Sequence, residues 1–122
     1  MSLIKQIHTT NLGDGEQSRC APERLLEGEP LYTSWEQDQA GEMVRTGVWA
    51  STPGKNISMK GSIYELCHLL EGTVEIAGDD GSVQRFSAGD TFVMKPGFKG
   101  TWRTVTPVRK IYMIVDTAAA AA

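Results

Sequence analysis

Residues 65–102 read ELCHLLEGTVEIAGDDGSVQRFSAGDTFVMKPGFKGTW, and this stretch decides the fold of the chain. Short runs rich in β-branched and aromatic residues alternate here with turn clusters at positions 71–72, 78–81, 88–90 and 95–97. A spacing of roughly 8 to 12 residues between such clusters is typical of a β-sandwich or a β-barrel. The stretch therefore predicts short antiparallel strands joined by tight turns.

The same alternation of strand-like runs and turn clusters continues on both sides of this stretch, from residue 43 to residue 115. No segment shows the long helical period that a βαβ crossover needs, so a parallel sheet is not expected. A set of short antiparallel strands can close into a jelly roll, which leaves few strand edges exposed. The prediction is an all-β jelly-roll barrel with strands at 43–51, 56–59, 63–70, 73–77, 83–86, 91–95, 101–105 and 108–115.

The residues outside this region carry weaker signals. The first 40 residues are predicted to be irregular, apart from one helical turn between Ala21 and Gly28, with Pro22 at its first position. The expected organisation has three parts. They are a short irregular N-terminal extension that packs on the barrel or on a partner subunit at 1–42, the barrel at 43–116, and a disordered or artefactual alanine tail at 117–122.

The composition is that of an ordinary globular chain. Its 122 residues are 40% hydrophobic and 22% charged, which is enough to bury a core within one domain. The net charge of −3 comes without a cluster of Lys and Arg, which argues against binding to nucleic acid. No apolar run approaches the roughly 18 residues of a membrane-spanning helix, and no apolar signal region stands at the N-terminus. We therefore expect a cytoplasmic protein with no membrane partner.

Several residues of the opening stretch, taken in order, resemble the two sequence motifs of the cupin family. They are Glu65 and Gly72 with six residues between them, Gly81, Ala88-Gly89-Asp90, Pro96-Gly97, Trp102 and, further on, Tyr112. The pattern is most similar to small single-domain (RmlC-like) cupins of the branch that includes ureidoglycine aminohydrolase-like and ethanolamine-utilisation-like proteins. The resemblance implies a cupin jelly roll and a homodimer.

The resemblance also implies a metal site, and here the chain departs from the family. The His-x-His that would precede Glu65 is replaced by residues 58–61, which read SMKG, and the position of a third histidine is Gly100. Glu65 is then the only remaining candidate ligand, and one carboxylate is a poor site for a transition metal. We expect no conventional metal and no other cofactor. A divalent ion held weakly by Glu65 stays open.

The face of each strand residue follows from alternation. The resemblance points Glu65 into the barrel, and alternation then sends Cys67 the same way and His68 the opposite way. An inward carboxylate has a raised pKa unless it is paired, so Glu65 could act as an acid or a base, or be a hydrogen-bonded structural group. Cys67 could be a nucleophile or a soft ligand, but an inward strand cysteine is more often a small core residue.

Aromatic residues complete a candidate pocket. If Gly100 faces inward, so does Trp102, and Trp49 would join it beside the carboxylate. Two indoles near Glu65 suit a small polar organic ligand, although the same rings could simply fill the barrel. Polar contacts at the mouth could come from Tyr64, Lys95 and Tyr112, whereas Arg103, Arg109 and Lys110 are expected on solvated faces.

Three functions remain open at this point. The preferred one is binding of a small polar organic molecule, without a conventional metal, by Trp49, Glu65, Cys67, Trp102 and Tyr112. The second is an enzyme in which Glu65 serves as acid, base or weak metal ligand on a small nitrogenous or sugar-derived substrate. The third is a structural or regulatory protein without catalysis. The sequence leaves undecided whether the chain is an enzyme.

Overall fold

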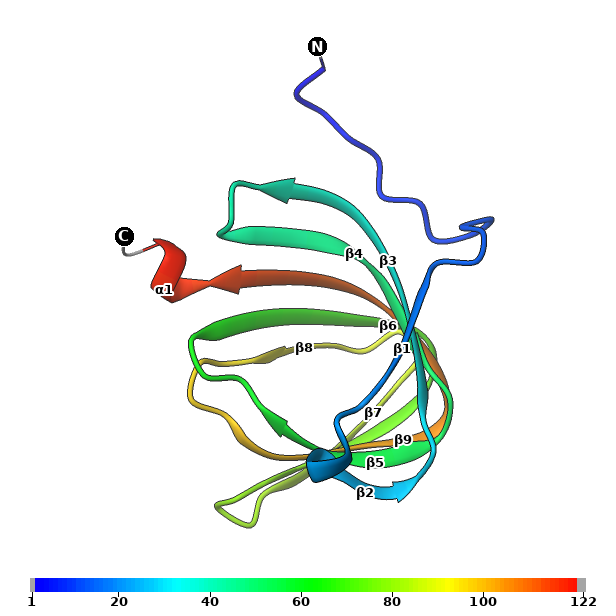
Figure 1. Cartoon of the computed structure of the whole chain (residues 1–122), viewed down its shortest axis with the longest axis vertical. Coiled ribbons are helices and arrows are strands. Elements are labelled where there is room, and N and C mark those ends of the chain that lie inside the picture. The colour runs from blue at the N-terminus through cyan, green and yellow to red at the C-terminus, as the bar shows by residue number, and fades with distance from the viewer. Residues whose placement is uncertain (1, 121–122) are drawn as a thin grey trace.

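The structure is a computed structural model, and it describes residues 2–120. The chain forms one curled, nine-stranded antiparallel sheet, whose curvature Figure 1 shows. The strands are β1 (Glu16–Arg19), β2 (Leu25–Gly28), β3 (Leu31–Ala40), β4 (Val44–Ser51), β5 (Gly54–Met59), β6 (Ile63–Gly78), β7 (Val83–Ser87), β8 (Thr91–Met94) and β9 (Lys99–Asp116). A 3₁₀ helix η1 (Pro22–Arg24) and a short helix α1 (Thr117–Ala120) complete the description. The all-β cupin jelly roll predicted from the sequence is confirmed.

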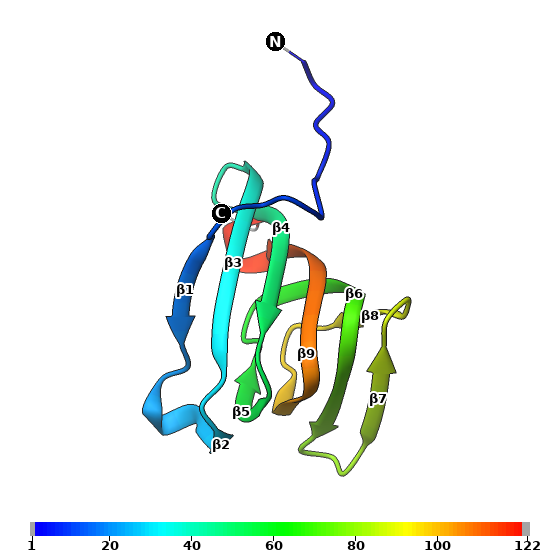
Figure 2. The same ribbon diagram turned by 90° about the vertical axis from the view of Figure 1, so that its right-hand side faces the viewer.

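Strand β9 organises the sheet because it changes partners along its length. Its first half pairs with β5 and its second half with β4, while β6 pairs along the other edge. Strand β6 in turn pairs with β8 and then with β7. Figure 2 shows β1, β3, β4 and β9 side by side, with β6 beyond β9. These exchanges curl one sheet into a cup.

The two longest strands bend where their ladder is irregular. The pairing of β6 with β9 shifts register between Leu69 and Val74. Gly72 lies at this bend with φ +86°, and a Cβ on it would overlap the carbonyl oxygen of Pro107. Such bulges increase the local twist of a strand. The sequence predicted separate strands on either side of residues 71–72 and 106–107, whereas the structure keeps each pair as one continuous, bent strand.

Alternation along β6 produces the inner face. Glu65, Cys67 and Leu69 are buried, whereas the intervening residues are half-buried or exposed. The inward direction predicted for Glu65 and Cys67 is therefore confirmed. The apolar core lies deeper in the cup and consists of Leu69, Val74, Ile76, Met94, Trp102 and Val108, with Trp49, Phe86, Phe92 and Phe98 packed against it.

The N-terminal part is more regular than the sequence predicted. Instead of an irregular segment, the structure has β1, β2 and β3, and β3 pairs with β4 from Tyr32 to Ala40. The helical turn expected between Ala21 and Gly28 shrinks to η1, because residues 25–28 join the sheet as β2. The segment before β1 leaves the sheet as an extended chain (Figure 1). The boundary proposed at residue 42 stays a prediction.

Residues 117–120 of the alanine tail form α1, and residues 121–122, also assigned to that tail, lie outside the described part. Among residues 2–120, no helix has both the length and the apolar character needed to cross a membrane.

Candidate functional site

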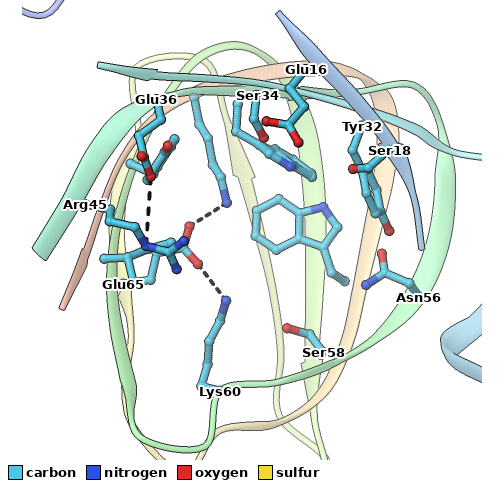
Figure 3. A pocket seen from close by; sticks show the side chains of 15 residues that line it. Glu16, Ser18, Tyr32, Ser34, Glu36, Arg45, Asn56, Ser58, Lys60 and Glu65 are labelled. Atoms are coloured by element: carbon cyan, nitrogen blue, oxygen red, sulfur yellow. Dashed lines mark hydrogen bonds and ion pairs between the residues drawn. The ribbon is translucent and has the colours of Figure 1, made fainter. Parts of the chain in front are cut away.

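A cavity of about 540 Å³ opens inside the cup. Figure 3 shows the side chains around it, which come from β1, β3, β4, β5, β6 and β9 and, for Lys60, from the connection between β5 and β6. Four of the five residues predicted to bind a ligand line this cavity: Trp49, Glu65, Trp102 and Tyr112. The fifth, Cys67, is fully buried and lies outside the cavity lining, with its Sγ 3.4 Å from Oε2 of Glu65. The structure thus brings the predicted set together, with Cys67 in the second layer.

Strand register explains why these side chains converge. In β9, the even-numbered residues face inward, so Trp102, Lys110 and Tyr112 share one face. Trp49 of β4 lies opposite Lys110, and Cys67 of β6 lies opposite Tyr112. Because neighbouring strands place directly opposed side chains close together, the aromatic and charged residues meet at one point of the wall.

The centre of the site is a lysine–carboxylate cluster made of Lys60, Glu65 and Lys110. The ammonium of Lys60 donates to Oε1 of Glu65 at 2.6 Å, and that of Lys110 donates to Oε2 at 2.7 Å. The side chains of Glu65 and Lys110 are 5% and 8% exposed, and that of Lys60 is 17% exposed. Both carboxylate oxygens are therefore held by ammonium groups, as the dashed lines in Figure 3 show, and the Glu65–Lys110 pair is largely shielded from solvent.

This cluster reverses the pKa shift that burial alone would produce. Burial raises the pKa of Glu65, but the charges of Lys110 and Lys60 and their hydrogen bonds outweigh burial and lower it to about 2. Burial lowers the pKa of Lys110, but the charge of Glu65 and its hydrogen bond raise it above the usual lysine value. The raised pKa expected for an unpaired Glu65 is thus not found, because the carboxylate is paired twice.

Lys110 is also enclosed by aromatic rings. Its ammonium nitrogen lies 4.5 Å from the ring centroid of Trp49 and 4.5 Å from that of Trp102. The two indoles stand edge to face with their centroids 5.8 Å apart. The indole nitrogen of Trp102 donates to Oγ1 of Thr104 at 3.0 Å, which fixes the ring. Cation–π contacts of this kind contribute roughly 0.5–2 kcal/mol each.

The prediction that Lys110 lies on a solvated face is therefore wrong, since the residue is only 6% exposed. Arg103 and Arg109 do lie outward, where they pair with Glu27 and Glu71. Tyr64 and Lys95, expected at the mouth, do not belong to the cavity lining. Sequence reasoning could have found Lys110 from its shared parity with Trp102 and Tyr112, and it could have found Lys60 from its place in the altered histidine motif.

The polar rim of the cavity was missed as well. Strand β3 contributes Tyr32, Ser34 and Glu36 on one face, and Arg45 of β4 reaches Glu36 at 4.0 Å. The three β3 residues lie in a segment that was predicted to be irregular, whereas Arg45 lies in the strand predicted at 43–51. Their alternation along β3 was the only available signal, and it was weak because both faces of that strand are largely polar.

The donors present do not fit a transition metal. Ser58 and Lys60 stand in the segment where histidines would be expected, and both oxygens of Glu65 already accept from ammonium groups. A Cβ built on Gly100 would overlap the carbonyl oxygen of Ala77, so this backbone has no room there for a histidine side chain. Among residues 2–120, no three His, Cys, Asp or Glu side chains form a group suited to an ion. Transition metals need several such ligands in fixed geometry.

Cys67 behaves as a buried, neutral thiol. Its Sγ donates to Oε2 of Glu65 at 3.4 Å and lies 3.7 Å from the ammonium of Lys110. Burial raises the pKa of Cys67, Lys110 opposes this shift and Glu65 adds to it, so the pKa reaches about 12. The thiolate is the reactive form of cysteine, so this geometry supports the core role over the nucleophilic one.

We predict that Cys67 resists alkylation in the folded protein. With iodoacetamide at pH 8, half-buried Cys20 should react and Cys67 should not, because its thiol is protonated and fully buried. Mass spectrometry of tryptic peptides reads both sites, and the same reaction in denaturant is the control in which both should be modified. Rapid native modification of Cys67 would contradict this assignment.

The depressed pKa of Glu65 predicts a specific loss of stability in acid. A group whose pKa is lowered by folding stabilises the native state above its unfolded value of 4.5, and this contribution disappears as pH falls towards about 2. The expected loss from this one group is about 3 kcal/mol. Urea titrations between these pH values measure it. The matched Glu65→Gln variant should lack this component, and parallel pH curves for the two proteins would refute it.

Comparison with known proteins places this geometry in context. The sequence model of the EutQ-like cupin domain matches residues 38–112. A DUF861-family protein of unknown function from Pseudomonas syringae pv. tomato is 33% identical, with a TM-score of 0.70 over 80% of this chain and 42% of that one. The chain therefore spans less than half the length of that relative. No curated protein matches the sequence significantly.

Two more distant structures share the fold. The EutQ protein of Clostridium difficile is 16% identical, with a TM-score of 0.63 over 71% of this chain and 64% of that one. A putative ethanolamine utilization protein Q from Salmonella typhimurium is 20% identical, with a TM-score of 0.60 over 73% and 71% of the two chains. At these identities the likeness concerns the arrangement of strands alone.

Proposed function

Because the chain belongs to the EutQ-like cupin family, we propose that it binds a small polar organic molecule inside the cup, without a conventional metal ion. The observation that carries this proposal is the cavity of about 540 Å³ beside the lysine–carboxylate cluster. Small-molecule sites typically enclose about 300–1,000 Å³ and combine apolar walls with a few fixed polar groups. A purely structural protein could fill its barrel with side chains, and the open cavity therefore favours the binding function over that alternative.

The lining has the mixed character that such a ligand needs. Aromatic walls come from Tyr32, Trp49, Trp102 and Tyr112, and neutral polar groups come from Asn56 and Ser58. Aromatic side chains give a large contact area together with directional preferences. A ligand with a flat body and polar ends fits between these groups.

The lysine–carboxylate cluster supports the proposal that no conventional metal is needed. In a metal-binding cupin, the cation beside this glutamate would be the ion, whereas here the positive charge comes from Lys60 and Lys110. Removing either ammonium would leave a buried carboxylate short of a partner, which is costly. The chain therefore supplies its own cations for Glu65.

The same geometry weakens the enzyme alternative based on Glu65. An efficient general acid or base has a pKa near the working pH, but the pKa of Glu65 is lowered to about 2. Both of its oxygens are also engaged by ammonium groups. We therefore assign Glu65 to binding and organisation of the site. The homodimer and the cytoplasmic location implied by the sequence and the family stay part of this proposal.

Tryptophan NMR signals test this function. In ¹H–¹⁵N spectra of the full chain, ligands from a broad panel of polar metabolites should shift the indole signals of Trp49 and Trp102. The signal of Trp35, which does not line this cavity, is the internal control. A panel in which no compound moves the first two signals selectively would refute the proposed function.

A further inference from the structure

We infer that the molecule held in this cavity is a small organic monoanion, and that its carboxylate binds the ammonium of Lys60. This inference rests on the proposed function, because it names the chemical class of the ligand for the same site. Three independent features of the described residues support it: the charge of the lysine–carboxylate cluster, the free donors of Lys60, and the position of Lys110 between two indoles.

The first feature is charge. Two ammonium groups surround one carboxylate, so the lysine–carboxylate cluster carries one excess positive charge in a poorly solvated place. Electrostatic interactions are stronger there than in water, and an uncompensated buried charge is costly. A monoanion neutralises the cluster. A dianion would leave one negative charge in excess, and a cationic ligand would add to the repulsion.

The second feature is hydrogen bonding. An ammonium has three N–H donors. Within residues 2–120, the only side-chain hydrogen bond of Lys60 is the one to Oε1 of Glu65, and its side chain lines the cavity. Two donors of Lys60 are therefore left for a ligand. A carboxylate is the matching acceptor, since charge-assisted hydrogen bonds are about twice as strong as neutral ones.

The third feature excludes the opposite class of ligand. Aromatic rings around a cavity often bind organic cations, which lie over the ring faces. Here that place is taken by the protein, because the ammonium of Lys110 lies 4.5 Å from the centroids of both Trp49 and Trp102. An incoming ammonium would have to displace Lys110 and break its 2.7 Å ion pair with Glu65.

The charges at the rim do not change this conclusion. Arg45 and Glu36 are 4.0 Å apart and offset each other, with side chains 52% and 44% exposed. Glu16 of β1 is exposed as well. Exposed charges are screened by water and salt, whereas the buried lysine–carboxylate cluster is screened much less. The cluster therefore decides which charge the cavity accepts.

Probes with the same carbon skeleton and different charges test the inference. Benzoate, benzamide and benzylamine form one series, and butyrate, butyramide and butylamine form a second. Each is titrated into the full chain at pH 7 by calorimetry, with the indole signals of Trp49 and Trp102 confirming the place of binding. In at least one series, the acid should bind at least about tenfold more tightly than its amide and its amine.

A variant of Lys60 tests the assigned contact. Lys60→Met keeps the length of the side chain and removes its charge, and Glu65 retains Lys110 as a partner. The Lys60→Met variant should bind the acid at least about tenfold more weakly and should no longer prefer the acid over the amide. Lys60→Arg, which keeps the positive charge, should retain part of both the affinity and the preference. The control is Lys99→Met, an exposed lysine outside the cavity, which should bind as the unmodified chain does.

The outcomes separate this inference from the proposed function. If neither series shows this preference, because an amide or amine binds about as tightly as its acid in both, the monoanion is overturned and a binding protein of another specificity remains. If neither acid shifts the indole signals, the inference is also overturned, and the wider metabolite panel then decides the proposed function by itself. If Lys60→Met fails to fold, the probe series on the unmodified chain still decides the inference.

Discussion

Replacing Glu65 by glutamine is expected to lower the free energy of unfolding by about 3–5 kcal/mol, the usual cost of leaving a buried charge without its partner. The change keeps the shape of the side chain but removes the charge that Lys60 and Lys110 share. Most of this cost arises at Lys110, because its buried ammonium would keep only a neutral thiol and two indoles as neighbours.

Chemical denaturation at pH 7 measures this effect. The matched control is Glu71→Gln, because Glu71 also pairs with a basic residue, Arg109, but has a side chain that is 59% exposed. Exposed pairs contribute about 0–1 kcal/mol, so the control should change stability by no more than that. If the free energy of unfolding falls equally little in both variants, the lysine–carboxylate cluster does not organise the site.

Replacing Gly100 by alanine is the second change expected to have a large effect. A Cβ at this position would overlap the carbonyl oxygen of Ala77 and lie 2.9 Å from the Cα of Gly78. Both atoms belong to the backbone of β6, which pairs with β9 at this point, so the clash cannot be relieved by turning a side chain. We expect a loss of about 3 kcal/mol or more, at the upper end of the cost of overpacking.

The control for Gly100 separates steric overlap from backbone strain. Gly61 has a positive φ of +57° but nothing within 4 Å of a built Cβ. Gly61→Ala should therefore cost only about 1–2 kcal/mol, the price of a left-handed conformation for alanine. Thermal or urea denaturation of both variants tests this order. A Gly100→Ala protein that is as stable as the parent would show that the strands can separate there, and that a histidine could stand at this position.

The sequence predicted the fold well because its signals are local. Turn clusters around 71–72, 88–90 and 95–97 divide the chain wherever the backbone reverses or bends, and alternation then assigns Glu65 and Cys67 to the interior. These rules need no knowledge of distant partners. They failed for β3, where polar residues face the cavity on one side and solvent on the other, so hydrophobic alternation is faint.

The lysine–carboxylate cluster was only partly predictable. Glu65 could be placed from its motif, but its pKa depends on partners that are distant in sequence or outside the strand pattern. Lys110 comes from a strand 45 residues further on, and Lys60 comes from a turn five residues earlier. A lysine in a strand is normally assigned to solvent, since buried lysines need a partner. Parity alone could place Lys110 on the inner face, and the three-dimensional arrangement then identifies Glu65 as its partner.

The central claim is that lysine ammonium groups, rather than a metal ion, neutralise Glu65 inside the cup. The most direct test is a high-resolution crystal structure of the protein grown with an excess of Mn²⁺, Ni²⁺ or Zn²⁺. We predict that the ammonium groups of Lys60 and Lys110 both stay within hydrogen-bond distance of Glu65, with no anomalous-scattering peak in the cavity. An anomalous peak coordinated by Glu65, with the two lysines displaced, would contradict the claim.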